Sequence, residues 1–101
     1  MNKAQRQMLE LLKVQMDEKG KHVSDLHLEL KALYLNHIGN LEGIHTRTWL
    51  VAEIMNRADD ERVKRAALLI YTAAVDYHSQ ACLFNEIYGQ LISLDKKEAP
   101  R

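Results

Sequence analysis

The chain has 101 residues, of which 47% are hydrophobic and 28% charged, and its fourteen basic and fourteen acidic side chains give a formal net charge of zero. This composition predicts one globular domain over 1–101, and the absence of a basic excess does not favour a nucleic-acid binder. No apolar run has the length of a membrane span or the form of a signal peptide, and the single cysteine, Cys82, excludes an intramolecular disulfide, so we expect a cytoplasmic protein.

The pattern of residues predicts an all-helical fold. The chain has one proline, Pro100, and four glycines, and it lacks alternating β-branched runs and Asn-Gly turns. A first helix is expected over residues 3–19, with Met8, Leu12 and Met16 on its apolar side. We expect Gly20 to end it, since glycine is the usual residue just after a helix.

A second helical segment is expected over residues 21–57. Its apolar residues recur at three- and four-residue steps, with His37 among them: Val23, Leu26, Leu30, Leu33, Leu41, Ile44, Val51 and Met55. Gly39 and Gly43 each weaken a helix interior by about 1 kcal/mol relative to alanine. Residues 39–43 could therefore form helix, kink or loop. We favour one continuous helix, because the long third helix needs a partner of equal length.

The third helix is expected over residues 60–94, with Asp59 or Asp60 as its N-cap and a polar tail at 95–101. One face carries a stripe of alternating small and large residues: Val63, Ala67, Ile70, Ala74, Tyr77, Ala81, Phe84, Tyr88 and Leu91. Such a stripe indicates close packing against other helices. At 1.5 Å per residue this helix spans about 50 Å, so it needs a partner of equal length.

Residues 21–57 are the predicted partner, in an antiparallel hairpin with residues 60–94. A hairpin and one short helix cannot cover both flanks of the stripe. We therefore predict a homodimer in which two hairpins form a four-helix bundle. Its core and dimer contacts would include Ile70, Ala74, Tyr77, Ala81, Phe84 and Tyr88.

Few residues suggest chemistry. Glu42 and His45 have the Glu-x-x-His spacing that lets two side chains on a helix share a metal ion, but no second motif accompanies them. We favour a solvated helix face there, and we predict no metal or other cofactor. His37 is expected to be a hydrogen-bonded core residue. Because Cys82 and the serines have no activating partners in the sequence, we predict a non-enzymatic protein.

The remaining candidate is a surface that contacts another protein. Trp49 lies off the apolar stripe beside Leu50, and Ile38 and Leu35 lie on the same outer side, a composition typical of an interface. Alternatively, the first helix folds back and covers this flank. We predict a small regulator of the adaptor, anti-activator or inhibitor kind, as bacteria and phages encode, which occludes a surface of a target protein. The alternatives are a metal-binding dimeric bundle and a nucleic-acid-associated regulator that uses Arg57, Arg62, Lys64 and Arg65.

Overall fold

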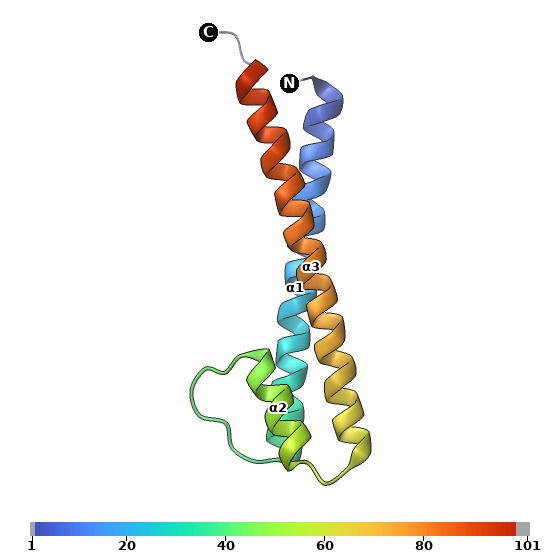
Figure 1. Cartoon of the computed structure of the whole chain (residues 1–101), viewed down its shortest axis with the longest axis vertical. Coiled ribbons are helices and arrows are strands. Elements are labelled where there is room, and N and C mark those ends of the chain that lie inside the picture. The colour runs from blue at the N-terminus through green and yellow to red at the C-terminus, as the bar shows by residue number, and fades with distance from the viewer. Residues whose placement is uncertain (1, 99–101) are drawn as a thin grey trace.

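The computed structural model describes residues 2–98, and this part of the chain forms three helices without strands, which confirms the all-helical prediction. Helix α1 spans Lys3–His37, α2 spans Arg47–Arg57 and α3 spans Glu61–Glu98. α1 and α3 lie side by side in antiparallel directions, so that α1 begins at the end of the molecule where α3 finishes (Figure 1). α2 packs against the other end of this pair.

The first helix is much longer than predicted, because Gly20 does not end it. A glycine inside a helix costs about 1 kcal/mol relative to alanine, and packing on either side can offset that cost. Here Leu9, earlier in the helix, and Val23, one turn after Gly20, are both buried in the hairpin. α1 starts with a capping box, in which Asn2 Oδ1 accepts from the Gln5 N–H at 2.9 Å and Gln5 Oε1 accepts from the Asn2 N–H at 3.0 Å.

A loop at residues 38–46 replaces the continuous helix that we favoured over 21–57. The N–H groups of Ile38 and Gly39 both donate to the Tyr34 carbonyl oxygen at the end of α1. Gly39 and Gly43 have φ angles of +154° and +80°, which residues with a side chain rarely adopt. Gly39 thus lies just past the end of the helix and Gly43 within the loop, and α1 takes the place of 21–57 as the partner of α3.

The start of α3 follows the prediction. The Asp60 carbonyl oxygen accepts from the N–H of Lys64, and the Asp60 carboxylate accepts from the N–H of Arg62 at 2.9 Å. Hydrogen bonds from the Arg62 backbone and side chain lower the pKa of Asp60 below its ordinary value of 3.8. α3 extends four residues past the predicted end at Leu94, and the last part of the predicted tail, 99–101, lies outside the described residues.

The hydrophobic core lies at the three-helix end, which we call the head (residues 24–78). Leu30 of α1, Leu50 and Ile54 of α2 and Ala67 of α3 have no exposed surface. The remaining two-helix part, residues 2–23 and 79–98, is called the stalk. Only Leu9 and Val23 are buried among the described stalk residues. Most of the burial that stabilises the fold is therefore in the head.

The molecule is elongated, with extents of 63 × 24 × 15 Å and a radius of gyration of 18.9 Å. A compact chain of this length has a radius of gyration of about 13 Å. The stripe on α3 faces α1, with Val63, Ala67 and Ala74 buried. Its other members are half-buried: Ile70, Tyr77, Ala81, Phe84, Tyr88 and Leu91. Within the described residues, none of the helices has a segment long and apolar enough to cross a membrane.

Candidate functional site

The structure separates the four residues predicted to contact a partner. Leu50 is completely buried in the head, so in this conformation it presents no surface to a partner. Ile38 and Trp49 are half-buried and pack against the core. Trp49 stacks on the His45 ring at 3.9 Å and lies 5.6 Å from the Tyr34 ring. Leu35, with 52% of its surface exposed, remains available to a partner.

The Glu-x-x-His pair does not lie on a helix, which removes the geometric basis of the metal-binding alternative. Glu42 and His45 are in the 38–46 loop, and the Glu42 backbone oxygen is 2.6 Å from His45 Nε2. The structure holds no group of three or more histidine, cysteine, aspartate or glutamate side chains suited to a metal ion, as far as it describes the chain. His37, predicted to be a core residue, is exposed at the end of α1 because the helix ends there.

The basic residues of the nucleic-acid alternative are mostly engaged with other side chains. Arg57 lies 3.7 Å from the Glu53 carboxylate and donates to the Tyr34 hydroxyl at 2.9 Å. Arg62 pairs with Asp60 and Lys64 with Glu61, each at 3.3 Å. Interleaved carboxylates neutralise these cations, so no observation favours a phosphate-binding patch at this turn.

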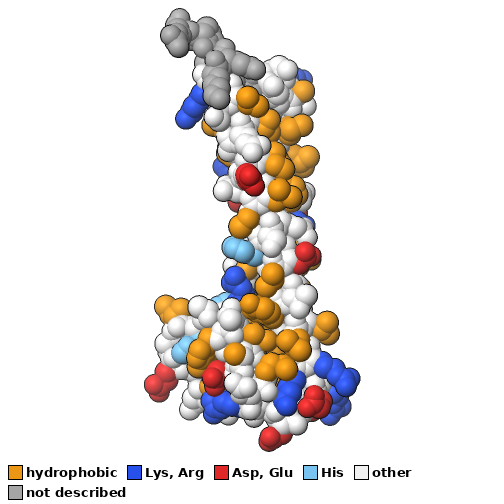
Figure 2. Space-filling model, in the orientation of Figure 1, with side chains coloured by type: hydrophobic (Ala, Val, Ile, Leu, Met, Phe, Trp, Pro, Cys, Tyr) orange, Lys and Arg blue, Asp and Glu red, His pale blue; other side chains and the backbone are white. Residues whose placement is uncertain are grey.

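One side of the hairpin, which no other element covers, carries apolar residues towards both ends and polar residues between them. Successive residues of an α-helix are rotated by about 100°, and this rotation directs Met8 and Leu11 of α1 to the same side as Ile87 and Leu91 of α3. Leu26, Leu33, Leu69, Ala73 and Phe84 lie on the same side, which we call the back face. Gln15, His22, Asp76 and Gln80 have the same rotation and interrupt its apolar residues near the middle of the molecule, where Gln80 donates to Asp76 at 3.2 Å. Met8, Leu11 and Leu69 are 51%, 60% and 72% exposed. Hydrophobic side chains also follow the right-hand edge of the stalk (Figure 2).

The side of the hairpin opposite the back face has a different character. Along the stalk it carries exposed polar and basic residues, including Arg6, Lys13, Asn85 and Ser93. In the head this opposite side is covered by α2, where the Thr48 hydroxyl lies 3.1 Å from the Tyr71 hydroxyl. The back face is thus the more apolar side of the hairpin, although polar residues divide it, and no helix covers it.

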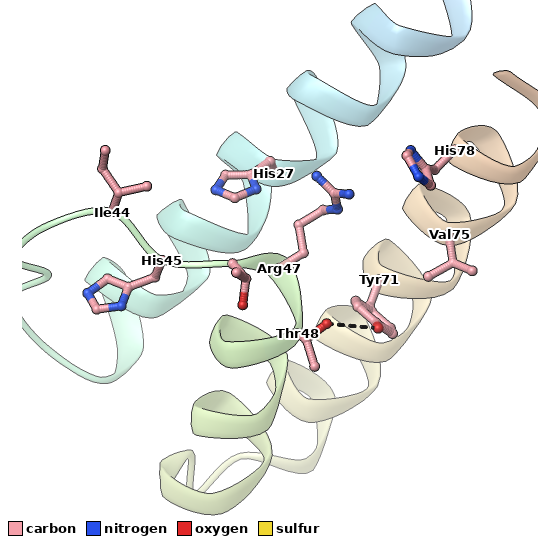
Figure 3. A pocket seen from close by; sticks show the side chains of 9 residues that line it. His27, Ile44, His45, Arg47, Thr48, Tyr71, Val75 and His78 are labelled. Atoms are coloured by element: carbon pink, nitrogen blue, oxygen red, sulfur yellow. Dashed lines mark hydrogen bonds between the residues drawn. The ribbon is translucent and has the colours of Figure 1, made fainter. Parts of the chain in front are cut away.

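A second feature is an open pocket of about 510 Å³ where the head joins the stalk. Its main polar groups come from three helices: His27 from α1, Arg47 and Thr48 from α2, and Tyr71 and His78 from α3. Ile44 and His45 of the loop complete one wall. The Arg47 side chain rises from the start of α2 into the space between His27 and His78 (Figure 3). We call this site the junction pocket.

The junction pocket is cationic. Burial, together with the positive charges of Lys31 and Arg47, lowers the pKa of His27 below its ordinary value of 6.5. Arg47 forms no ion pair with any side chain that the structure describes. The positive end of α2, at Arg47 and Thr48, adds to the same potential.

The lowered pKa of His27 predicts a loss of stability in mild acid. The unfolded chain binds a proton at His27 more readily than the folded one, so the free energy of unfolding falls as the pH drops below about 6.5. We expect His27→Gln to reduce the difference between urea unfolding curves recorded at about pH 7.5 and about pH 5.5. An unchanged difference would contradict this origin. The contribution of Asp60 is lost only below pH 3.8, outside that window.

Comparison of the chain with protein families, with curated proteins and with solved structures found no significant match.

Proposed function

We propose that the protein is a non-enzymatic, cytoplasmic interaction module that acts as a homodimer and binds a target protein, as small bacterial and phage regulators do. The observation that carries this proposal is the uncovered back face, where both long helices expose apolar residues in the stalk and in the head. Large exposed apolar patches on soluble proteins usually mark an interface.

A second copy of the chain fits this surface in length and chemistry. The back face follows a molecule 63 Å long, so two helices each about 10 Å wide offer a side of roughly 1,200 Å² per copy, polar and apolar residues together. A stable interface of standard size buries about 800 Å² per partner. Two hairpins paired by their back faces form a four-helix bundle, in which each stalk gains the apolar contacts that it lacks alone.

In such a dimer, other apolar residues of the heads remain exposed to water. Leu28 and Leu35 lie on the outer side of α1, seven residues and thus two turns apart, and are 61% and 52% exposed. In our proposal this pair contacts the target and occludes a surface that the target needs for another partner. Trp49 and Ile38 would lie beneath this contact and pack against the core. They would not form the centre of the interface.

Target binding is tested by capture from a lysate of the source cells. We expect the wild-type protein to retain one stoichiometric partner and Leu35→Lys to lose it, because lysine places a charge in the apolar contact. Val14→Lys is the matched control, since Val14 is 55% exposed on the outer side of the stalk. Equal capture by Leu35→Lys and wild type would exclude the proposed head surface.

A further inference from the structure

We propose that the junction pocket binds a small organic anion, with a carboxylate or phosphate group near Arg47 and an apolar body against the loop and α3. Because the pocket lies on the α2 side of the hairpin, away from the back face, this site does not depend on the proposed dimer. Its chemistry is shared by a free metabolite and by an acidic side chain of a protein, and the test below separates these sources.

One guanidinium group and two imidazole rings converge in the pocket from different helices. His27 of α1, Arg47 of α2 and His78 of α3 surround one space (Figure 3). The described residues that line the pocket include no aspartate or glutamate. A guanidinium group without a carboxylate partner is well suited to a two-point contact with a carboxylate or phosphate, and histidines beside it can donate further hydrogen bonds.

The rest of the lining favours an anion with an apolar body. Ile44 is 97% exposed and Val75 is 45% exposed, and both border the pocket beside the Tyr71 ring. The hydroxyl groups of Thr48 and Tyr71, 3.1 Å apart, provide hydrogen-bond donors at the start of α2. A volume of about 510 Å³ is within the range of small-molecule sites and leaves room for more than a bare anion. Arg47 repels a cation from the same space.

The experiment follows the histidine ring signals of the wild-type protein by NMR during titration with phenyl phosphate, benzoate and inorganic phosphate. An anion beside a histidine favours its protonated form, so the pKa of His27 should rise when the ligand binds. Signals of His27 and His78 should shift, whereas those of His22 and His37, which do not line the pocket, should not. Benzyl alcohol, which has the ring without the charge, serves as the ligand control.

Two variants assign the binding to the pocket. Arg47→Gln is expected to weaken the binding of phenyl phosphate roughly tenfold or more, because it removes a charged hydrogen-bond donor. Arg65→Gln, at an exposed arginine outside the pocket, should leave the binding unchanged. Binding of the small anions supports a free ligand. Binding of only a short acidic peptide, with the same loss in Arg47→Gln, supports a protein-borne carboxylate.

The proposal is overturned if neither the anions nor the peptide shifts His27 and His78, or if Arg47→Gln and Arg65→Gln bind equally. Either result would leave the dimer intact, so failure of this site is distinguishable from failure of the proposed function.

Discussion

Replacing Leu11 by lysine is expected to convert the proposed dimer into a monomer at micromolar concentrations. Leu11 is 60% exposed on the stalk of one chain, at the back face, where a second copy would cover it. Burying a leucine contributes about 1.5–3 kcal/mol, and a symmetric dimer loses this contribution twice. The dissociation constant should therefore rise roughly 100-fold or more. Sedimentation velocity at several protein concentrations measures this change.

The matched control for Leu11→Lys is Leu35→Lys, which makes the same substitution at a similar exposure of 52% on the head. Leu35 lies outside the back face, so this variant should sediment like the wild type. A dimer that survives Leu11→Lys, or one that dissociates equally in both variants, would show that the stalk is not the contact. Circular dichroism of each variant establishes that the helices remain formed.

Replacing Leu50 by alanine is expected to destabilise the head strongly. Leu50 has no exposed surface and packs with Leu30 and Ile54, and a buried leucine replaced by alanine costs about 2–5 kcal/mol. A domain of this size has only about 5–15 kcal/mol of total stability, so the midpoint of urea unfolding should fall clearly. The change in the free energy of unfolding measures the effect.

Leu28→Ala provides the comparison for Leu50→Ala, because Leu28 is 61% exposed and its truncation should change stability by less than about 0.5 kcal/mol. If Leu50→Ala kept the stability of the wild type and lost only target binding, Leu50 would be the partner contact that the sequence first indicated. The two leucines thus separate a core role from an interface role.

The regular parts of the fold could be predicted from the sequence. The stripe from Val63 to Leu91 repeats without interruption, and α3 forms along it with Val63, Ala67 and Ala74 buried. The boundaries before residue 58 could not be predicted, because glycine alone does not fix a helix end. Gly20 lies inside α1, whereas Gly39 and Gly43 adopt positive φ angles in a loop, and only the tertiary packing distinguishes these cases.

The same boundary explains the errors at the candidate site. In a continuous helix over 21–57, the rotation of about 100° per residue would place Trp49 and Leu50 on the side away from the apolar stripe. In the structure the loop separates α1 from α2, so the orientation of α2 does not follow from that of α1. Leu50 of α2 points into the core. The loop also takes Glu42 and His45 off the helix.

The junction pocket had no signal in the sequence. His27, Arg47 and His78 come from three helices and meet only because α2 folds back against the hairpin. No spacing rule connects residues so far apart in the chain. Their single shared feature, a positive or titratable side chain, is too common in this sequence to identify them.

The pairing of two hairpins by their back faces is tested most directly by the mass of the wild-type protein in solution. Sedimentation equilibrium over a range of concentrations should give twice the chain mass of 11.7 kDa, with dissociation only on strong dilution. A folded protein that sediments as a single 11.7 kDa chain at every concentration would contradict the account, because the apolar residues of its back face would then remain in water without a partner.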